Sequence, residues 1–198
     1  MKKLLIATGN QGKIREYKEI FKQLKLPIKL TSLKELGIKE KAKETGKTFR
    51  ENAIIKAKLF SKLSNLPTLS DDAGIEIDYL KGEPGVKSRR WLGYELTDEE
   101  IINIALKKLE GVPKKKRSAR LRAVIGLNFP PSKKIYTFEG ALKGFIAEKP
   151  ISKRLKGYPF RSIFIPFGDK KYLGQLNIVA HRKKAVEKSL PIIKKYLC

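Results

Sequence analysis

The sequence predicts an α/β protein, because segments typical of strands alternate with segments typical of helices. Three observations support this class. The short apolar segment Lys2–Ala7 has the length of a buried strand, and a glycine-bearing turn and an amphipathic helix follow it. Two capping boxes open further helices. Residues 118–147 contain two long strand-like runs.

The turn after the first strand, Thr8–Lys13, opens a helix with one apolar face. Strand, glycine turn and helix together point backbone N–H groups and a helix N-terminus at an anion. Lys13 would add a cation for phosphate. The spacing is not that of a Walker loop, and an ordinary strand-to-helix turn is the alternative. The apolar face of the helix contains Ile14, Tyr17, Phe21 and Leu24.

A second strand is expected at Pro27–Ser32, followed by a polar stretch that reaches Gly46. Thr48–Glu51 is a capping box, so a helix should begin there and end near Asn65. The residues that we expect to face inward from this helix are Ala53, Ala57 and Phe60.

An acidic pair, Asp71 and Asp72, lies inside an apolar run. We expect the pair to close a short strand, with Gly74 turning the backbone into a second strand at residues 75–79. Neighbouring carboxylates repel each other, which raises the pKa of one of them unless a cation sits between them. Two acids beside a glycine suit Mg²⁺, which prefers carboxylate oxygens. A solvated turn is the alternative, since Asp and Gly are common in turns.

The next segment, Gly82–Trp91, is interpreted as a loop whose tryptophan packs between lobes or subunits rather than serving as a stacking platform. The second capping box, Thr97–Glu100, should open a helix that ends at Gly111, a typical position for glycine after a helix.

Two long strands, Ser118–Phe129 and Ile135–Ile146, are predicted to form a hairpin. A short strand is expected at residues 163–165. His181 and Arg182 open the last helix, and Pro191 should kink it on its solvent side. His181 is interpreted either as a first-turn helix residue that bonds to backbone or as a contact to a base. The last helix should face inward through Val186, Leu190, Ile193 and Leu197.

The formal net charge is +25, from 45 Lys and Arg against 20 Asp and Glu. This charge indicates anionic partners: phosphates, nucleotides or nucleic acid. The basic residues are spread along the chain, and 35 of them are Lys. A non-specific contact with polyanions is therefore expected. The one dense cluster, Lys114–Arg117, is interpreted as an exposed loop, with an RNA or DNA contact as the alternative.

Composition also bears on the compartment. No apolar run approaches the roughly 20 residues needed to span a bilayer, so no membrane contact is expected. The apolar segment after the N-terminal lysines is too short for the core of a signal peptide. Cys198 is the only cysteine, which excludes an internal disulfide and fits a reducing compartment. We expect a cytoplasmic protein.

Several motifs together resemble one family, the inosine triphosphate pyrophosphatases, also called HAM1-like non-standard purine nucleotide pyrophosphatases. The resemblance runs from end to end, with the motifs in the family's order. The segments that carry it are Ala7–Lys13, Glu44–Ala53, Ser70–Gly74, Pro84–Ser88, Phe138–Gly140 and His181–Arg182.

The resemblance implies an elongated α/β fold with a mixed central sheet flanked by helices. It also implies a single domain, residues 1–198, with two lobes and a nucleotide cleft between them, and a homodimer. The implied activity is hydrolysis of inosine or xanthosine triphosphate, or their deoxy forms, to monophosphate and pyrophosphate. A catalytically altered member of the same fold that binds nucleotides or nucleic acid is the alternative.

The resemblance also implies roles for individual residues. Asp72, with Asp71, would be catalytic, orienting or deprotonating the attacking water, and Glu44 with Asp72 would hold Mg²⁺ as cofactor. The nucleoside triphosphate would be bound by Thr8, Gly9, Asn10, Gln11, Gly12, Lys13, Ala73, Tyr158, Pro159, Phe160, Arg161, His181 and Arg182.

The chain departs from the family pattern at three places. Ala73 stands where the family has a serine after the catalytic aspartate. Arg161 replaces an acid in the base-recognition segment, where Tyr158 and Phe160 preserve aromatic stacking. The segment before His181, Gly174–Ala180, is shortened and lacks a family Lys and Ser. The residues that bind phosphate and the acidic residues are therefore expected to keep their functions, while the selectivity for the nucleotide base is expected to be changed or lost.

Overall fold

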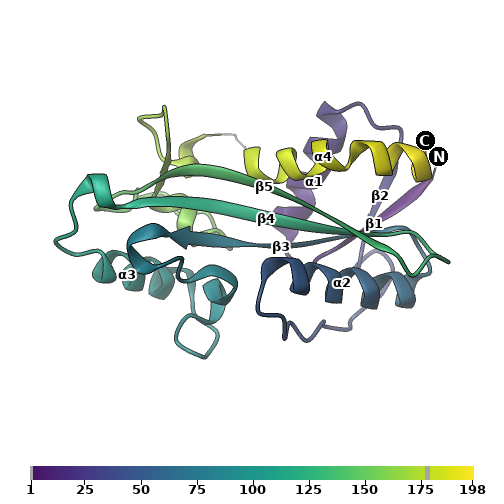
Figure 1. The fold of residues 1–198 in the computed structure, drawn as a ribbon, viewed down its shortest axis with the longest axis horizontal. Helices are drawn as coiled ribbons and strands as arrows, with labels where there is room; N and C mark the ends of the chain where they lie inside the picture. The colour runs from purple at the N-terminus through teal and green to yellow at the C-terminus, as the bar shows by residue number, and fades with distance from the viewer. Residues whose placement is uncertain (1, 177–178) are drawn as a thin grey trace. The chain divides into compact units, whose positions relative to one another are not determined.

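A computed structural model describes residues 2–176 and 179–198, and it confirms the α/β class (Figure 1). The strands form one six-stranded sheet in the order β2-β1-β3-β4-β5-β6. The sheet is mixed, because β1 runs parallel to β2 and β3 while β5 and β6 are antiparallel. The strands are β1 (Lys3–Ala7), β2 (Lys29–Ser32), β3 (Thr68–Ile77), β4 (Ser118–Asn128), β5 (Ile135–Ile146) and β6 (Phe164–Pro166). The helices are α1 (Gln11–Gln23), α2 (Phe49–Ser64), α3 (Asp98–Lys108) and α4 (Ala180–Leu197).

The chain divides into two compact units. Unit 1 comprises Met1–Ala73, Ala123–Gly140 and Val179–Cys198, and unit 2 comprises Gly74–Arg122 and Ala141–Ile178. The strands β3, β4 and β5 contribute residues to both units. Asn177 and Ile178, which belong to the shortened segment before His181, lie outside the described residues.

Unit 1 is built in three layers because β1 alternates its side chains between two apolar clusters. Leu4 and Ile6 pack into a core with apolar residues of α1 and α4. Leu5 and Ala7 point the other way, into a smaller cluster with Phe60 of α2. Figure 1 shows α2 on one side of the strands, and α1 and α4 on the other.

The predicted turn at Gly74 is wrong. Residues 68–77 form one continuous strand, β3, which passes through the acidic pair without interruption. β3 pairs with β1 through Thr68–Ser70 on one side and has β4 as its hydrogen-bonded neighbour on the other, so Gly74 continues the extended backbone of an inner strand. The chain turns only after Ile77, through a 3-10 turn at Asp78–Leu80.

Both predicted capping boxes are present. The Thr48 side chain accepts from the backbone N–H of Glu51 at the start of α2, and Thr97 accepts from Glu100 at the start of α3. α3 ends at Lys108, before the predicted Gly111. In α4, Val186, Ile193 and Leu197 are buried as expected and Pro191 is exposed, whereas Leu190 is only half-buried.

Unit 2 has its own apolar core, in which α3 packs on the outer parts of the long strands. Trp91 packs against this core, and its indole N–H donates to Glu83 at 3.1 Å. None of the helices in the described part of the chain combines the length and the apolar content that crossing a bilayer would require. Core side chains of unit 2 include Ile75, Ile77, Ile101, Ile102, Leu109, Phe160, Ile163 and Phe164.

Candidate active site in unit 1

The predicted phosphate turn and the acidic pair lie at one edge of the sheet. β1 and β3 are parallel neighbours, with Ala7 opposite Ser70. The turn therefore leaves β1 beside the point where the acidic pair begins in β3. Ligands of α/β proteins bind at such carboxyl ends of parallel strands. The sheet thus brings together two segments about 60 residues apart in the sequence.

Asn10 organises the turn at the start of α1. Its side-chain oxygen accepts from the backbone N–H of Gly12 at 2.8 Å and of Lys13 at 3.2 Å, which caps the helix. Thr8 supports the turn by accepting from the N–H of Asn10 at 3.2 Å. Gly9 is exposed, and a methyl group there would meet no atom within 4 Å. The turn is therefore preformed, with open space beside Gly9.

Asp71 faces α1 and α4 and is 2% exposed. Its carboxylate pairs with the ammonium of Lys13, accepts the hydroxyl of Tyr17 at 2.7 Å and accepts Nε of Arg182 at 2.9 Å. Arg182 also donates to Glu16 at 2.8 Å. Burial by itself would raise the pKa of Asp71, but the charges of Arg182 and Lys13 overcome it and hold that pKa well below its usual range. Asp71 is therefore a fixed anion.

Asp72 faces α2 and is 7% exposed. It accepts Nζ of Lys56 at 2.7 Å and Nδ2 of Asn52 at 3.3 Å. Lys56 also donates to Glu44 at 3.1 Å, so one ammonium lies between two carboxylates. Burial raises the pKa of Asp72 above its usual value, although Lys56 opposes the shift. The pKa of Lys56 is itself raised, because Asp72 and Glu44 outweigh the effect of burial.

The two aspartates have different partners because successive side chains of a strand point to opposite faces. The solvated-turn alternative for this pair is excluded, since both carboxylates are buried within β3. Among the described residues, no single cation pairs with both acids. Each acid has its own cation, Lys13 with Arg182 on one face and Lys56 on the other.

The other predicted residues of unit 1 lie near this cluster. Ala73 follows Asp72 in β3 and is half-buried. His181 is buried in the first turn of α4, and its Nε2 accepts from the Arg182 guanidinium at 3.0 Å. Gln11, exposed, is the first residue of α1.

The predicted base-recognition segment belongs to unit 2. Pro159–Ser162 form a 3-10 turn in which Pro159 and Phe160 are buried, Phe160 in the apolar core. The Arg161 guanidinium lies over the Tyr158 ring, 4.6 Å from its centroid. The Phe160 ring is therefore part of the apolar core of unit 2, whereas the Tyr158 ring lies under the Arg161 guanidinium.

Sequence reasoning missed Lys56, Asn52 and Glu16 as members of the cluster. A signal existed for Lys56, since it is three residues after Ala53 and so belongs to the face of α2 that was predicted to be inward. A lysine on such a face needs a buried partner. Tyr17 was predicted as core, which is correct for its ring, but nothing in the sequence indicated that its hydroxyl reaches Asp71.

Glu44 and Asp72 fit a divalent cation of the magnesium type. Their oxygens already converge on one cationic group, the Lys56 ammonium, and hard carboxylate oxygens are the ligands that such an ion prefers. The described residues contain no group of three or more His, Cys, Asp or Glu side chains suited to a metal. An ion here would therefore take its remaining ligands from water and substrate phosphates.

A family model, the Ham1 family, matches residues 4–192. The chain belongs to the Ham1 family. Curated relatives align over nearly the whole chain. A dITP/XTP pyrophosphatase of Bacillus subtilis (strain 168) is 38% identical over 193 residues, which is 95% of each chain. A dITP/XTP pyrophosphatase of Caldanaerobacter subterraneus subsp. tengcongensis is 37% identical over 203 residues, 100% of this chain and 98% of the relative.

Solved Ham1 structures have the same fold. The Coxiella burnetii HAM1 protein matches with a TM-score of 0.82 at 33% identity, over 98% of this chain and 100% of the other. The Staphylococcus aureus Ham1 protein matches with a TM-score of 0.80 at 32% identity, over 98% and 99%. The Ham1 resemblance inferred from the motifs is confirmed.

Proposed function

We propose that the chain is a nucleotide pyrophosphatase that hydrolyses non-standard purine nucleoside triphosphates to monophosphate and pyrophosphate. The observation that carries the proposal is the setting of Asp72, a buried carboxylate of raised pKa that shares one cation with Glu44 beside the capped turn of α1. The names of the relatives, dITP/XTP pyrophosphatases, supply the substrate class.

The triphosphate would bind at the N-terminal end of α1. Asn10 already occupies the N–H groups of Gly12 and Lys13, so the open space at Gly9 and the charge of Lys13 are what the turn offers to phosphate oxygens. Asp71 and Arg182 would hold Lys13 in place, because the Lys13 ammonium is tied to a carboxylate that Arg182 also binds. Asp71 is then a positioning residue rather than a base.

Asp72 would act as the general base. A water would attack the α-phosphorus, its proton would pass to the Asp72 carboxylate, and the bond from the α-phosphorus to the bridging oxygen would break so that pyrophosphate leaves. A raised pKa favours this role, since a base works best when its pKa lies nearer the operating pH. Asn52 would orient the carboxylate through its side-chain N–H.

Glu44 and Asp72 would hold Mg²⁺. When bound, the ion would supply Lewis-acid stabilisation to phosphate oxygens. The Lys56 ammonium would then exchange these carboxylates for phosphate oxygens, because it competes with the ion for the same ligands.

Base choice is proposed to favour keto purines. Arginine offers only donors, and these match the 6-keto oxygen and N7 of hypoxanthine, xanthine or guanine but not the amino group of adenine. Arg161, held over Tyr158, is the residue proposed to read the base. A homodimer and a cytoplasmic location belong to the same proposal, the latter because the lone Cys198 is a free thiol.

The first prediction tests the enzyme itself. Pyrophosphate release is measured with Mg²⁺ across inosine, xanthosine, guanosine and adenosine triphosphates, for the unchanged chain and for Asp72→Asn. We expect turnover of the keto purines above adenosine triphosphate. We expect the turnover rate of Asp72→Asn to be lower by about 10²- to 10⁴-fold, which is the range that a general base contributes.

Glu95→Gln is the matched control, because it removes an exposed carboxylate of unit 2 and should leave turnover unchanged. Circular dichroism must show that Asp72→Asn is folded. A folded Asp72→Asn chain that keeps most of its activity would overturn the role of Asp72. No pyrophosphate release from any triphosphate would favour the nucleotide-binding alternative.

A further inference from the structure

Arg117 in unit 2 is a buried cation without a partner among the described residues. It was expected in an exposed loop with Lys114–Lys116, and this expectation is wrong for Arg117. The three lysines are exposed in a single 3-10 turn, whereas Arg117 is 4% exposed. Its buried Nε has no hydrogen-bond acceptor, and no carboxylate of the described residues forms an ion pair with its guanidinium.

The backbone of Arg117 explains why the residue is held there. Its N–H donates to the carbonyl of Lys114 at 3.1 Å, and its carbonyl accepts from Ile146 at the end of β5 at 2.9 Å. The residue is therefore tied both to the 3-10 turn and to the sheet. Arginine stays charged at any physiological pH, and a buried charge is costly unless it is paired. A charged group fixed in this state points to a partner from outside the described chain.

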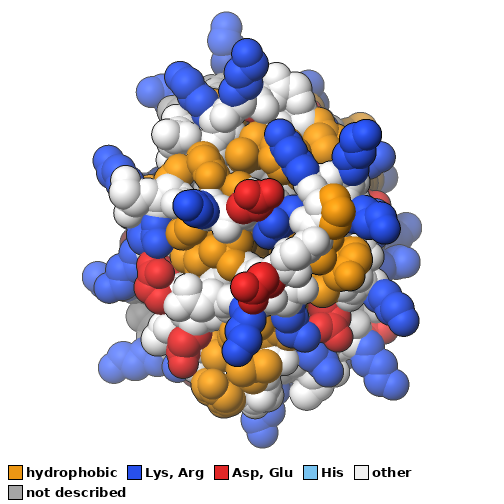
Figure 2. Space-filling model, turned by 90° about the vertical axis from the view of Figure 1, so that its left-hand side faces the viewer, with side chains coloured by type: hydrophobic (Ala, Val, Ile, Leu, Met, Phe, Trp, Pro, Cys, Tyr) orange, Lys and Arg blue, Asp and Glu red, His pale blue; other side chains and the backbone are white. Residues whose placement is uncertain are grey.

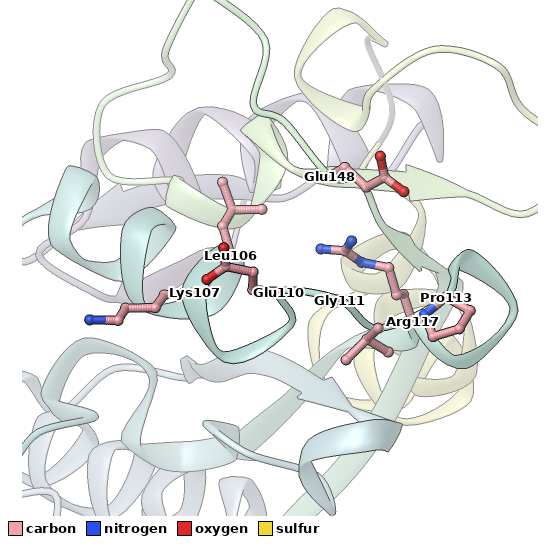
Figure 3. Close-up of a pocket in the computed structure, with 8 residues that line it drawn as sticks. Leu106, Lys107, Glu110, Gly111, Pro113, Arg117 and Glu148 are labelled. Carbon is pink, nitrogen blue, oxygen red and sulfur yellow. The ribbon is translucent and has the colours of Figure 1, made fainter.

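A pocket of about 560 Å³ lies in front of the guanidinium. Figure 3 shows Arg117 reaching into the space between the C-terminal end of α3 and Glu148. Lys107, Glu110 and Glu148 stand at its exposed rim. The walls also include the apolar side chains of Leu106, Val112 and Pro113.

The lining indicates the kind of ligand. A guanidinium presents its N–H groups in a planar fork that fits a carboxylate or phosphate with two parallel hydrogen bonds. The two rim carboxylates, Glu110 and Glu148, repel a dianion such as phosphate more than they repel a monoanion. The apolar wall favours an organic body attached to the anionic group. We propose that this pocket binds a small organic carboxylate, with the carboxylate on Arg117 and the apolar part against Leu106, Val112 and Pro113.

The test is a calorimetric titration of the full chain with sodium benzoate at constant ionic strength. Benzoate should bind, and Arg117→Lys should weaken binding about tenfold or more, since lysine keeps the charge but loses the fork. Arg90→Lys is the matched control, because Arg90 is an exposed arginine of the same unit, and it should bind benzoate as the unchanged chain does. Equal binding by all three chains would overturn the proposal.

Two further arms separate the ligand from other partners. Inorganic phosphate, titrated under the same conditions, should bind more weakly than benzoate, and binding as tight or tighter would overturn the carboxylate assignment. Glu148→Gln and Glu110→Gln should leave the melting temperature of the protein unchanged and should not weaken the binding of benzoate. A marked fall in melting temperature in either variant would show that a carboxylate of the chain itself pairs with Arg117, which would also overturn the proposal.

A crystal of the unchanged chain soaked in 4-bromobenzoate keeps the proposal testable if Arg117→Lys does not fold. An anomalous bromine peak beside Leu106, Val112 and Pro113 is expected, and its absence from the pocket would overturn the assignment. Sedimentation of Arg117→Lys completes the test. Dissociation of a dimer in this variant would assign Arg117 to a carboxylate of a second copy instead of a small molecule.

Discussion

At the scale of the residue, Asp71 and Asp72 show how one peptide bond can separate two chemistries. Asp71 has two cations and a tyrosine hydroxyl around it, and its pKa is held far below the usual range. Asp72 has one cation that it shares with Glu44, and its pKa is raised. When environments push the pKa values of two acids apart, the acid of raised pKa is the one suited to proton transfer. We therefore propose that Asp71 supports the site and that Asp72 takes part in the chemistry.

The structural role of Asp71 leads to the second mutational prediction at the proposed active site. Asp71→Asn removes the carboxylate but leaves Lys13 and Arg182 charged and buried beside it. Breaking one side of a buried ion pair costs about 3–5 kcal/mol. We expect the free energy of unfolding, measured by urea denaturation at neutral pH, to fall by about this amount.

Lys18→Gln is the control for this measurement. This substitution removes the ion pair between Lys18 and Glu35, whose charged atoms lie 3.7 Å apart and whose side chains are both about half exposed. The free energy of unfolding should therefore fall by less than about 1 kcal/mol. If Asp71→Asn costs no more than Lys18→Gln, the buried network does not stabilise the fold as the structure indicates.

At the scale of the element, the sequence predicted most helices and strands because their signals are local. The capping boxes placed the starts of α2 and α3, and the two long strand-like runs placed β4 and β5 within about one residue. The run 68–77 was misjudged because glycine and two acids are local turn signals. Pairing of β3 in the middle of the sheet overrides them, and no local pattern records which strands will be neighbours.

The same limit applied to the candidate site. The turn at residues 8–13 and the acids Glu44, Asp71 and Asp72 could be chosen from residue type and motif. Their division between two faces of β3 depends on which helix covers which face, and so on tertiary packing. Arg117 was misplaced for a related reason, because a run of four basic residues predicts solvent exposure, while the hydrogen bond to Ile146 draws only the last one inward.

The contact between α4 and β5 yields a prediction for an element. A methyl group at Gly140 would overlap the carbonyl oxygen of His181 and lie 2.8 Å from the backbone nitrogen of Ala185. Because both are backbone atoms, Gly140→Ala should push the start of α4 away from the strand. We expect a loss of about 1–3 kcal/mol in the free energy of unfolding, together with lower turnover, since Arg182 moves with α4.

Thr137→Ala is the matched control. Thr137 is a half-buried residue of the same strand, and its substitution shortens a side chain without adding any atom beside α4. Thermal denaturation and pyrophosphate release are measured on both variants. Wild-type stability and turnover in Gly140→Ala would show that the helix yields without cost and that the close approach is not needed.

At the scale of the whole molecule, the charge of +25 is dispersed rather than gathered. On the face shown in Figure 2, Lys and Arg side chains project all around, with hydrophobic and a few acidic side chains between them. Lysines predominate, 35 to 10, and lysine is a point charge on a flexible stem that does not provide bidentate contacts. Such a surface attracts any polyanion by counterion release, with no means of reading its sequence.

The last prediction follows from that dispersion. Binding to random duplex DNA should be measurable at low salt and should weaken linearly in log Kd against log salt, with a slope of about 0.9 for each phosphate contacted. Duplexes of unrelated sequence should give the same curve. The triple variant Lys114→Gln, Lys115→Gln, Lys116→Gln removes the densest exposed cluster, yet only 3 of 45 basic residues. We therefore expect it to reduce the slope by less than a fifth. A collapse of binding in this variant, or a clear preference for one duplex at physiological salt, would show instead that these three lysines form a dedicated nucleic-acid site.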